Sequence, residues 1–150
     1  MTQVDFYHLN QSDLETALII LMKKTVAVGK SALILCPKAA ATSLDVTLWT
    51  HEAESWIAHG VDDASGANVA PVWISTDSAR NPINAPFLFL LHGQKPSSFE
   101  SFERVFNLFD GRSDAQVIVA RTQWKKWGEN SALKFGYYVQ SDDGRWQKNS

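Results

Sequence analysis

The sequence predicts an α/β domain built on a mainly parallel sheet. Short, continuously apolar segments, which are typical of strands buried on both faces, occur at residues 31–36, 72–75 and 87–92. Amphipathic segments that favour helices cover residues 12–28 and 113–127. Strands and helices that alternate along a chain form parallel strand pairs, and the helices then cover the two faces of the sheet.

The composition is typical of a globular protein. The chain has 150 residues, which fits one domain spanning residues 1–150. Its hydrophobic fraction of 45% exceeds that of disordered chains. The formal net charge of −2 gives no overall basic field for nucleic acid or for an acidic membrane. The first ten residues lack the pattern of a signal peptide, and no apolar run reaches membrane-spanning length, so we expect a cytoplasmic protein.

The N-terminal part of the chain is expected to form a strand, a helix and a second strand. Residues 4–9 alternate in polarity and are rich in β-prone types. The helix over residues 12–28 opens with a capping box, SDLE at 12–15, in which the serine hydroxyl caps the first turn. Gly29 is expected to end this helix in a left-handed conformation. The apolar run at 31–36 forms the next strand.

The middle of the chain is expected to hold a helix, a loop and two strands. A second helix spans Ala39–Trp49. Residues 59–71, HGVDDASGANVAP, are small and acidic and contain glycine, which predicts a loop. The buried-type strands at 72–75 and 87–92 follow. Between them lies TDSARNPINAP, whose two prolines favour another loop.

The C-terminal part is expected to contain a turn, a helix and a hairpin. Residues 99–103 favour a short helical turn, and RVFNLF at 104–109 fits either a strand or a continued helix, because periodicity does not separate the two. A second capping box, SDAQ at 113–116, opens a helix that ends near Trp127. Residues 133–148, LKFGYYVQSDDGRWQK, are expected to form a hairpin with its turn at SDDGR.

Gly29-Lys30-Ser31 matches the end of a phosphate-binding P-loop. The complete pattern needs a glycine where this sequence has Lys24, and it follows a strand and precedes a helix. Here a helix is expected before the motif and a strand after it, so a helix stop at Gly29 is favoured. The alternative is a nucleotide-dependent α/β enzyme that uses this motif, whose ATP binding Lys30→Ala would abolish.

The sequence shows no catalytic constellation and no metal-binding pattern. His8, His51, His59 and His92 lack the spacing that would place two ligands on one helix face. Cys36 is the one cysteine, so the chain has no internal disulfide and no cysteine-based metal cluster, and we expect a buried thiol. We therefore expect no catalytic residue, no metal and no cofactor.

The segment ARTQWKKWG, residues 120–128, combines cations with indole rings. On a helix, Arg121, Trp124 and Lys125 share a sector, because residues three and four apart are neighbours. Such a sector can stack on bases, as in a direct binder of single-stranded nucleic acid through Trp124 and Trp127. It can equally hold an apolar side chain beside a carboxylate. A third interpretation is an ordinary amphipathic helix that buries a tryptophan and keeps its lysines in water.

The whole chain resembles the chi subunit of bacterial DNA polymerase III holoenzyme. The resemblance rests on the order and spacing of several segments rather than on one motif. These segments are VDFYHL (4–9), SLDVTLWTHEAESWIAHG (43–60), PFLFLLHG (86–93), FERVFNLFDG (102–111), ARTQWKKWG (120–128) and the closing GRWQK (144–148).

The resemblance implies a three-layer α/β/α fold with a mainly parallel, Rossmann-like sheet and a non-catalytic adaptor attached to the clamp loader. One surface of such a protein holds the C-terminal tail of single-stranded DNA-binding protein, SSB. Another holds the psi subunit or a different clamp-loader component. SSB tails end in acidic residues followed by a phenylalanine that carries the terminal carboxylate, so the receptor needs an apolar slot and fixed cations.

The resemblance also implies the residues of these two surfaces. Arg121 matches the family's position for pairing with a carboxylate, Lys125 matches the nearby basic residue, and Trp124 matches the aromatic position beside them. Trp49 matches the tryptophan of a facing element, and Trp56 falls in the stretch that contacts psi.

The sequence departs from the family at one position of the tail site. One turn before Arg121 the family can carry a further lysine, and this chain has Val117. Tail binding would then be weaker, or would depend on Lys126 and Arg112.

Overall fold

A computed structural model describes residues 2–43, 59–61, 72–76, 85–96, 98–143 and 145–148. The described strands are β1 (Thr2–Leu9), β2 (Ala32–Leu35), β3 (His59–Val61), β4 (Val72–Ser75), β5 (Phe87–Leu91), β6 (Arg104–Asp110), β7 (Leu133–Gln140) and β8 (Trp146–Lys148). The helices are α1 (Leu14–Ala27) and α3 (Asp114–Trp127), and residues 38–43 are also helical.

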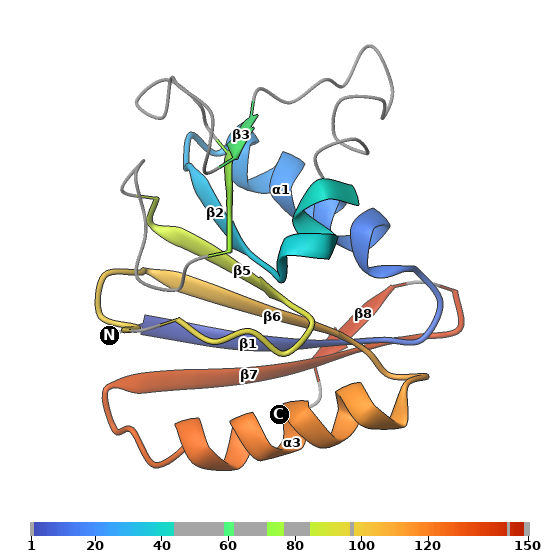
Figure 1. Ribbon diagram of the computed structural model, residues 1–150. Coiled ribbons are helices and arrows are strands. Elements are labelled where there is room, and N and C mark those ends of the chain that lie inside the picture. The colour runs from blue at the N-terminus through green and yellow to red at the C-terminus, as the bar shows by residue number, and fades with distance from the viewer. Residues whose placement is uncertain are drawn as a thin grey trace.

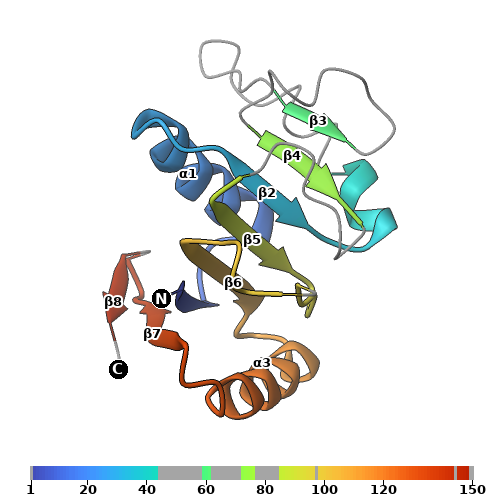
Figure 2. The ribbon, with the colours of Figure 1, turned by 90° about the vertical axis from the view of Figure 1, so that its left-hand side faces the viewer.

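The strands form one sheet in the order β3-β4-β2-β5-β6-β1-β7-β8 (Figure 1). Every pair is parallel except β7–β8, which forms the predicted antiparallel hairpin. Helix α1 lies on one face of the sheet and α3 on the other (Figures 1 and 2). This confirms the predicted α/β fold with a mainly parallel sheet between helical layers.

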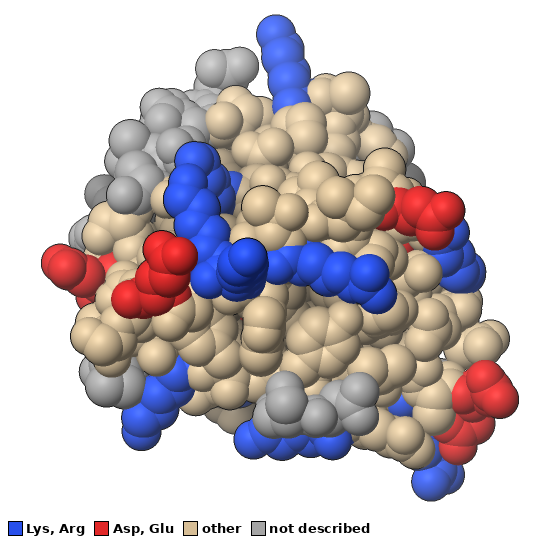
Figure 3. Space-filling view, turned by 90° about the horizontal axis from the view of Figure 1, so that it is seen from below, with Lys and Arg blue, Asp and Glu red and all other residues tan. Residues whose placement is uncertain are grey.

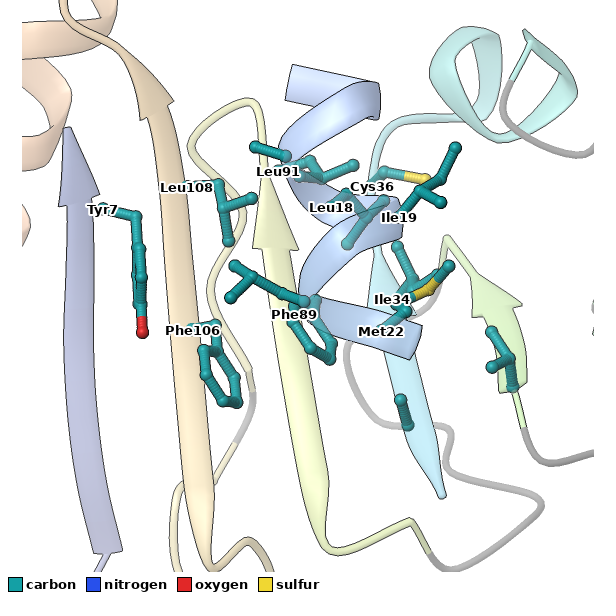
Figure 4. Close-up of a cluster of buried hydrophobic side chains, with 14 of the residues drawn as sticks. Tyr7, Leu18, Ile19, Met22, Ile34, Cys36, Phe89, Leu91, Phe106 and Leu108 are labelled. Carbon is teal, nitrogen blue, oxygen red and sulfur yellow. The ribbon is translucent and has the colours of Figure 1, made fainter. Parts of the chain in front are cut away.

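Each face of the sheet carries its own buried cluster. On the α1 side, Leu18 and Met22 of the helix pack over Ile34 and Phe89 of the sheet, and Tyr7 stands on the strand beyond them (Figure 4). On the other side, residues of α3 pack with alternate residues of β1, β6 and β7. Because successive side chains of a strand point to opposite faces, one sheet serves both clusters.

The N-cap of helix α1 lies one residue later than the sequence predicts. Asp13 is its N-cap and accepts a hydrogen bond from the Thr16 N–H at 2.8 Å. The predicted cap, Ser12, is held elsewhere, because its N–H donates to Gln140 Oε1 at 2.9 Å and its hydroxyl accepts from Gln140 Nε2 at 2.9 Å. A glutamine far along the chain therefore overrides the local capping box. Ser113, in contrast, is the N-cap of α3, as predicted.

Gly29 ends α1 in the left-handed conformation that the sequence predicts, with φ of 80°. The Gly29 N–H donates to the Val26 carbonyl at 2.9 Å, and the Lys30 N–H donates to the Thr25 carbonyl at 3.1 Å. This is the hydrogen-bond pattern of a Schellman motif. Since helix carbonyls occupy both N–H groups, the turn does not form a phosphate cradle.

We expect Gly29→Ala to lower the free energy of unfolding by about 1 kcal/mol, because alanine disfavours the left-handed region. Nothing lies within 4 Å of the added Cβ, so backbone conformation accounts for the whole loss. Urea denaturation measures it. Gly29→Asn is the control and should lose less, since asparagine tolerates this conformation; equal losses would contradict the account.

Strand pairing determines the secondary structure of two further segments. Residues 104–110, for which the sequence left strand and helix open, form β6 between β5 and β1. The loop predicted for 59–71 is wrong at its start, because His59–Val61 pairs with β4. The predicted helix Ala39–Trp49 is helical over 38–43, and its remainder lies outside the described residues. Gly144, in the predicted hairpin turn, also lies outside them.

Candidate functional site

The candidate site is built on α3, which is capped by one side-chain contact and joined to the sheet by another. Ser113 caps the helix by accepting a hydrogen bond from the Gln116 N–H at 3.3 Å. Asn107 of β6, which is buried, donates its side-chain amide to Gln123 Oε1 at 2.9 Å. These contacts fix both the start and the rotation of the helix.

The inward face of α3 buries one tryptophan and half-buries another. Trp127 is 7% exposed, and its ring packs against Phe6 and Phe99 with centroid distances of 5.6 and 5.0 Å. Trp124 lies one turn earlier and is half-buried, with its ring centroid 5.2 Å from that of Phe6. Trp127 is thus a core residue, which removes one of the two rings required by direct nucleic-acid binding on this helix.

Trp124 forms one side of an aromatic surface that continues onto β7. Its ring meets Phe135 edge-on at 5.5 Å and Tyr137 edge-on at 5.6 Å. Both β7 residues are themselves half-buried. This arrangement offers a partner an apolar wall of fixed geometry.

The cations predicted for the site are exposed on the same helix. Arg121 and Lys125 flank Trp124 in the sector defined by residues three and four apart. Their side chains make no hydrogen bond or ion pair with any other residue that the structure describes. Figure 3 shows Lys and Arg side chains across the middle of the face that carries α3, with Asp and Glu toward its sides. An acidic ligand would therefore meet cations that have no competing partner among the described residues.

His8 and Tyr137 form a polar pair beside Arg121. His8 Nδ1 and the Tyr137 hydroxyl share a hydrogen bond of 2.9 Å. Burial is the main reason that the pKa of His8 lies below its ordinary value of 6.5. A hydrogen bond with the Asn10 side chain acts in the opposite direction, and the positive charge of Arg121 lowers the pKa further. Burial also raises the pKa of Tyr137. The guanidinium of Arg121 is thus close enough to act electrostatically on both side chains.

Removing Arg121 should raise the pKa of His8. Arg121→Ala takes away a positive charge that disfavours the protonated imidazole, so protonation begins at a higher pH. NMR titration of the His8 ring protons measures this shift. The control is Lys125→Ala, which removes an equal charge and which we expect to move the His8 pKa less. An unchanged pKa in Arg121→Ala would mean that the guanidinium does not lie near His8.

Two further predicted cations, Arg112 and Lys126, do not join Arg121, Trp124 and Lys125. Trp49 and Trp56 lie outside the described residues. Val117 is half-buried against the core on the α3 side. Arg112 is engaged elsewhere, since its Nε donates to Asp110 Oδ1 at 2.9 Å. Lys126 follows Val119 and Gln123 at helical spacing, which places it on the opposite flank of α3.

A small cavity of about 150 Å³ lies on that opposite flank, between α3 and the turn after β5. Its lining includes His92, Phe109, Val119 and Gln123. None of the predicted site residues borders it. The cavity and the Arg121 side of α3 are therefore separate features of the same helix.

Sequence reasoning missed His8, Phe135 and Tyr137 as neighbours of the predicted cations. The available signal was the period of two within each strand, which places Phe6 with His8 and Phe135 with Tyr137 on one face. The pairing of β1 with β7 then brings these faces together.

Neither a metal site nor a membrane span emerges from the described part of the chain. No group of three or more His, Cys, Asp or Glu there is arranged to hold a metal ion. Likewise, no helix in those residues combines the length and apolar character needed to cross a bilayer.

Comparison with known proteins yields one family. The family model described as DNA polymerase III chi subunit, HolC, matches residues 1–132. The matched part contains β1, α1 and the whole of α3, and it ends immediately before β7. Arg121, Trp124 and Lys125 thus fall inside the match and Tyr137 falls after it. A search of curated proteins found no match.

Proposed function

This chain belongs to the DNA polymerase III chi subunit family, and we propose that it is a non-catalytic adaptor that binds the C-terminal tail of SSB on α3. Membership makes it an accessory subunit of DNA polymerase III. The proposal adds the ligand and the surface that receives it.

The observation that carries the proposal is the combination of exposed Arg121 and Lys125 with the half-buried ring of Trp124. A peptide that ends in acidic residues and a phenylalanine needs cations and an apolar wall within a few residues. Arg121 is the carboxylate-pairing residue, because a guanidinium offers two parallel donors to a carboxylate. Lys125 receives an upstream acidic side chain as a point charge.

The remaining residues of the proposal come from the resemblance. Trp49 completes the tail site from a facing element. Trp56 contacts psi or another clamp-loader component on a second surface, so that one chain links SSB to the replication machinery. DNA enters this adaptor role only through SSB.

A non-catalytic role is supported by the turn at Gly29. The alternative enzyme needs the backbone N–H groups of the Gly29-Lys30-Ser31 motif to bind phosphate. Helix carbonyls already accept from Gly29 and Lys30, and Lys30 Nζ lies 3.5 Å from Glu103 Oε2. The motif serves as a helix stop, and we propose no nucleotide chemistry there.

Isothermal titration of the full chain with an SSB tail peptide tests the proposal. We expect a dissociation constant in the micromolar range, which corresponds to about −8 kcal/mol. The matched control is the same peptide without its final phenylalanine, and it should bind at least about tenfold more weakly because both the ring and the position of the carboxylate are lost. A flat trace with the complete peptide would refute tail binding.

A further inference from the structure

A second groove lies on the opposite face of the sheet from α3. It runs between the C-terminal end of α1 and the short strand β8, and its volume is about 390 Å³. Its lining includes Tyr7, Phe106, Tyr138, Trp146, Lys24 and Arg104. None of these belongs to the site on α3. Helix α1 packs on β2, β5 and β6, and Figure 4 shows Tyr7 on the strand beyond that cover.

Aromatic rings form the floor and one wall of this groove. Tyr7 and Phe106 are 6% and 3% exposed, so they make a closed floor. Tyr138 stacks on Tyr7 at 5.0 Å, and Trp146 meets Tyr7 edge-on at 4.9 Å. Tyr138 and Trp146 are half-buried, which leaves part of each ring for a ligand.

Strand register places two lysines on the same face as these rings. Gln3 and Tyr7 share a face of β1, because side chains alternate along a strand. Gln3 pairs with Lys134, and Tyr138 pairs with Lys148. Directly opposed residues of neighbouring strands project to the same side. Lys134 and Lys148 therefore border the aromatic surface, and both are exposed.

Arg104 is held rigidly at the groove. Its guanidinium donates to Asp5 Oδ2 at 2.8 Å and lies 4.5 Å from the centroid of the Phe106 ring. The Asp5 carboxylate is buried, with 2% of its side chain exposed. Asp5 thus balances the charge of Arg104 from beneath and presents little negative charge to the solvent.

Three lysines give the groove its charge. Lys24 lines it from α1. Lys134 of β7 and Lys148 of β8 lie outside this lining, on the face of the sheet that carries it. Their side chains make no hydrogen bond or ion pair within the part of the chain that the structure describes. Nearby Glu103 is paired with Lys30 at 3.5 Å. The surface is locally cationic although the whole chain carries a net charge of −2.

We infer that this groove binds a short segment of single-stranded DNA. Its bases stack on the half-buried rings of Trp146 and Tyr138, and its phosphates lie beside Lys24, Lys134 and Lys148. Aromatic rings framed by cations are the usual way to hold a single strand without reading its sequence. A purely acidic peptide without an aromatic residue would use the lysines but would leave the rings without a role, and an acidic tail that ends in phenylalanine is separated from DNA by the tail-affinity control below. DNA is the natural polyanion because the family serves a DNA polymerase. The inference goes beyond tail binding and uses a different surface.

Fluorescence anisotropy of a labelled oligo-dT with the full chain tests this inference. We expect binding at about 50 mM salt that weakens steeply as salt is added, with a log–log slope near −2 for about three lysine–phosphate contacts. Lys134→Ala/Lys148→Ala should weaken binding at least about tenfold and reduce the slope by about 1.4. Lys38→Ala/Lys95→Ala is the matched control, since it removes two exposed lysines outside the groove and should leave binding unchanged.

The aromatic wall needs its own variant. Trp146→Leu should weaken oligo-dT binding by at least about fivefold with the slope unchanged, because a stacking surface is lost and no charge. Absence of oligo-dT binding, or equal losses in the two lysine variants, would overturn the inference. So would displacement of oligo-dT by a poly-glutamate peptide together with unaltered binding by Trp146→Leu, which would indicate an acidic polypeptide. SSB-tail affinity measured on Lys134→Ala/Lys148→Ala should equal that of the unmodified chain, so the two proposals succeed or fail separately.

Discussion

Arg121→Ala is expected to weaken binding of the SSB tail peptide at least about tenfold, because a charge-assisted pair between guanidinium and carboxylate contributes about 1.5–3 kcal/mol. Arg121 is exposed and makes no hydrogen bond or ion pair within the described residues, so its removal leaves no buried group unpaired. The folded state should therefore be unaffected. Anisotropy of the labelled peptide measures the affinity, and a thermal melt checks the fold.

The matched control for Arg121→Ala is Arg145→Ala. Arg145 lies beside the β7–β8 turn with 85% of its side chain exposed, and its removal changes the net charge by the same amount. Tail affinity should stay within about twofold of the unmodified chain, as surface charges far from a site act weakly through screened solvent. If both variants lost affinity equally, overall charge rather than a defined carboxylate site would explain binding.

Phe6→Ala is expected to lower the free energy of unfolding by about 3–5 kcal/mol. Phe6 is fully buried on β1, and its ring lies among those of Trp124, Trp127 and Tyr137. Truncation leaves a cavity beneath α3 that these large, rigid rings fill poorly. Urea denaturation measures the loss.

The control for Phe6→Ala is Phe135→Ala, on the same face of the sheet. Phe135 is half-buried and meets Trp124 edge-on, so its truncation exposes less of the core. We expect a loss of about half that of Phe6→Ala or less. A loss in Phe6→Ala no larger than in Phe135→Ala would mean that the cluster beneath α3 is not the centre of packing on this face.

The main elements follow from periodicity and caps, which are local properties of the chain. The apolar runs of β2, β4 and β5 and the helical spacing of α1 and α3 place these elements correctly. Gly29 ends α1 as predicted because a glycine after a helix satisfies its last carbonyls locally.

The errors in the fold arise where distant residues decide local structure. Ser12 does not cap α1, because Gln140 takes its N–H and its hydroxyl. Residues 59–61 form β3 because β4 pairs with them, although their composition favours a loop. Neither contact can be predicted from the local sequence of the residues that it affects.

The candidate site also combines residues that local spacing predicts with residues that only distant contacts bring in. Helical spacing alone groups Arg121, Trp124 and Lys125. The neighbours His8 and Tyr137 come from strands far apart in the sequence, and only the register of β1 with β7 joins them. Helical spacing alone does not tell which of Trp124 and Trp127 is buried in the core. The burial of Trp127 depends on its contact with Phe99, which precedes β6.

The most direct test of the adaptor account is a ¹H–¹⁵N NMR titration of the full chain with the SSB tail peptide. The account predicts that the largest shifts occur in the amides of α3 around Arg121 and in the indole Nε1–H of Trp124. Saturation should occur at micromolar peptide, and the signals of Trp146 and β8 should stay unchanged. Shifts confined to other surfaces, with α3 unaffected, would contradict the central claim that this helix receives the tail.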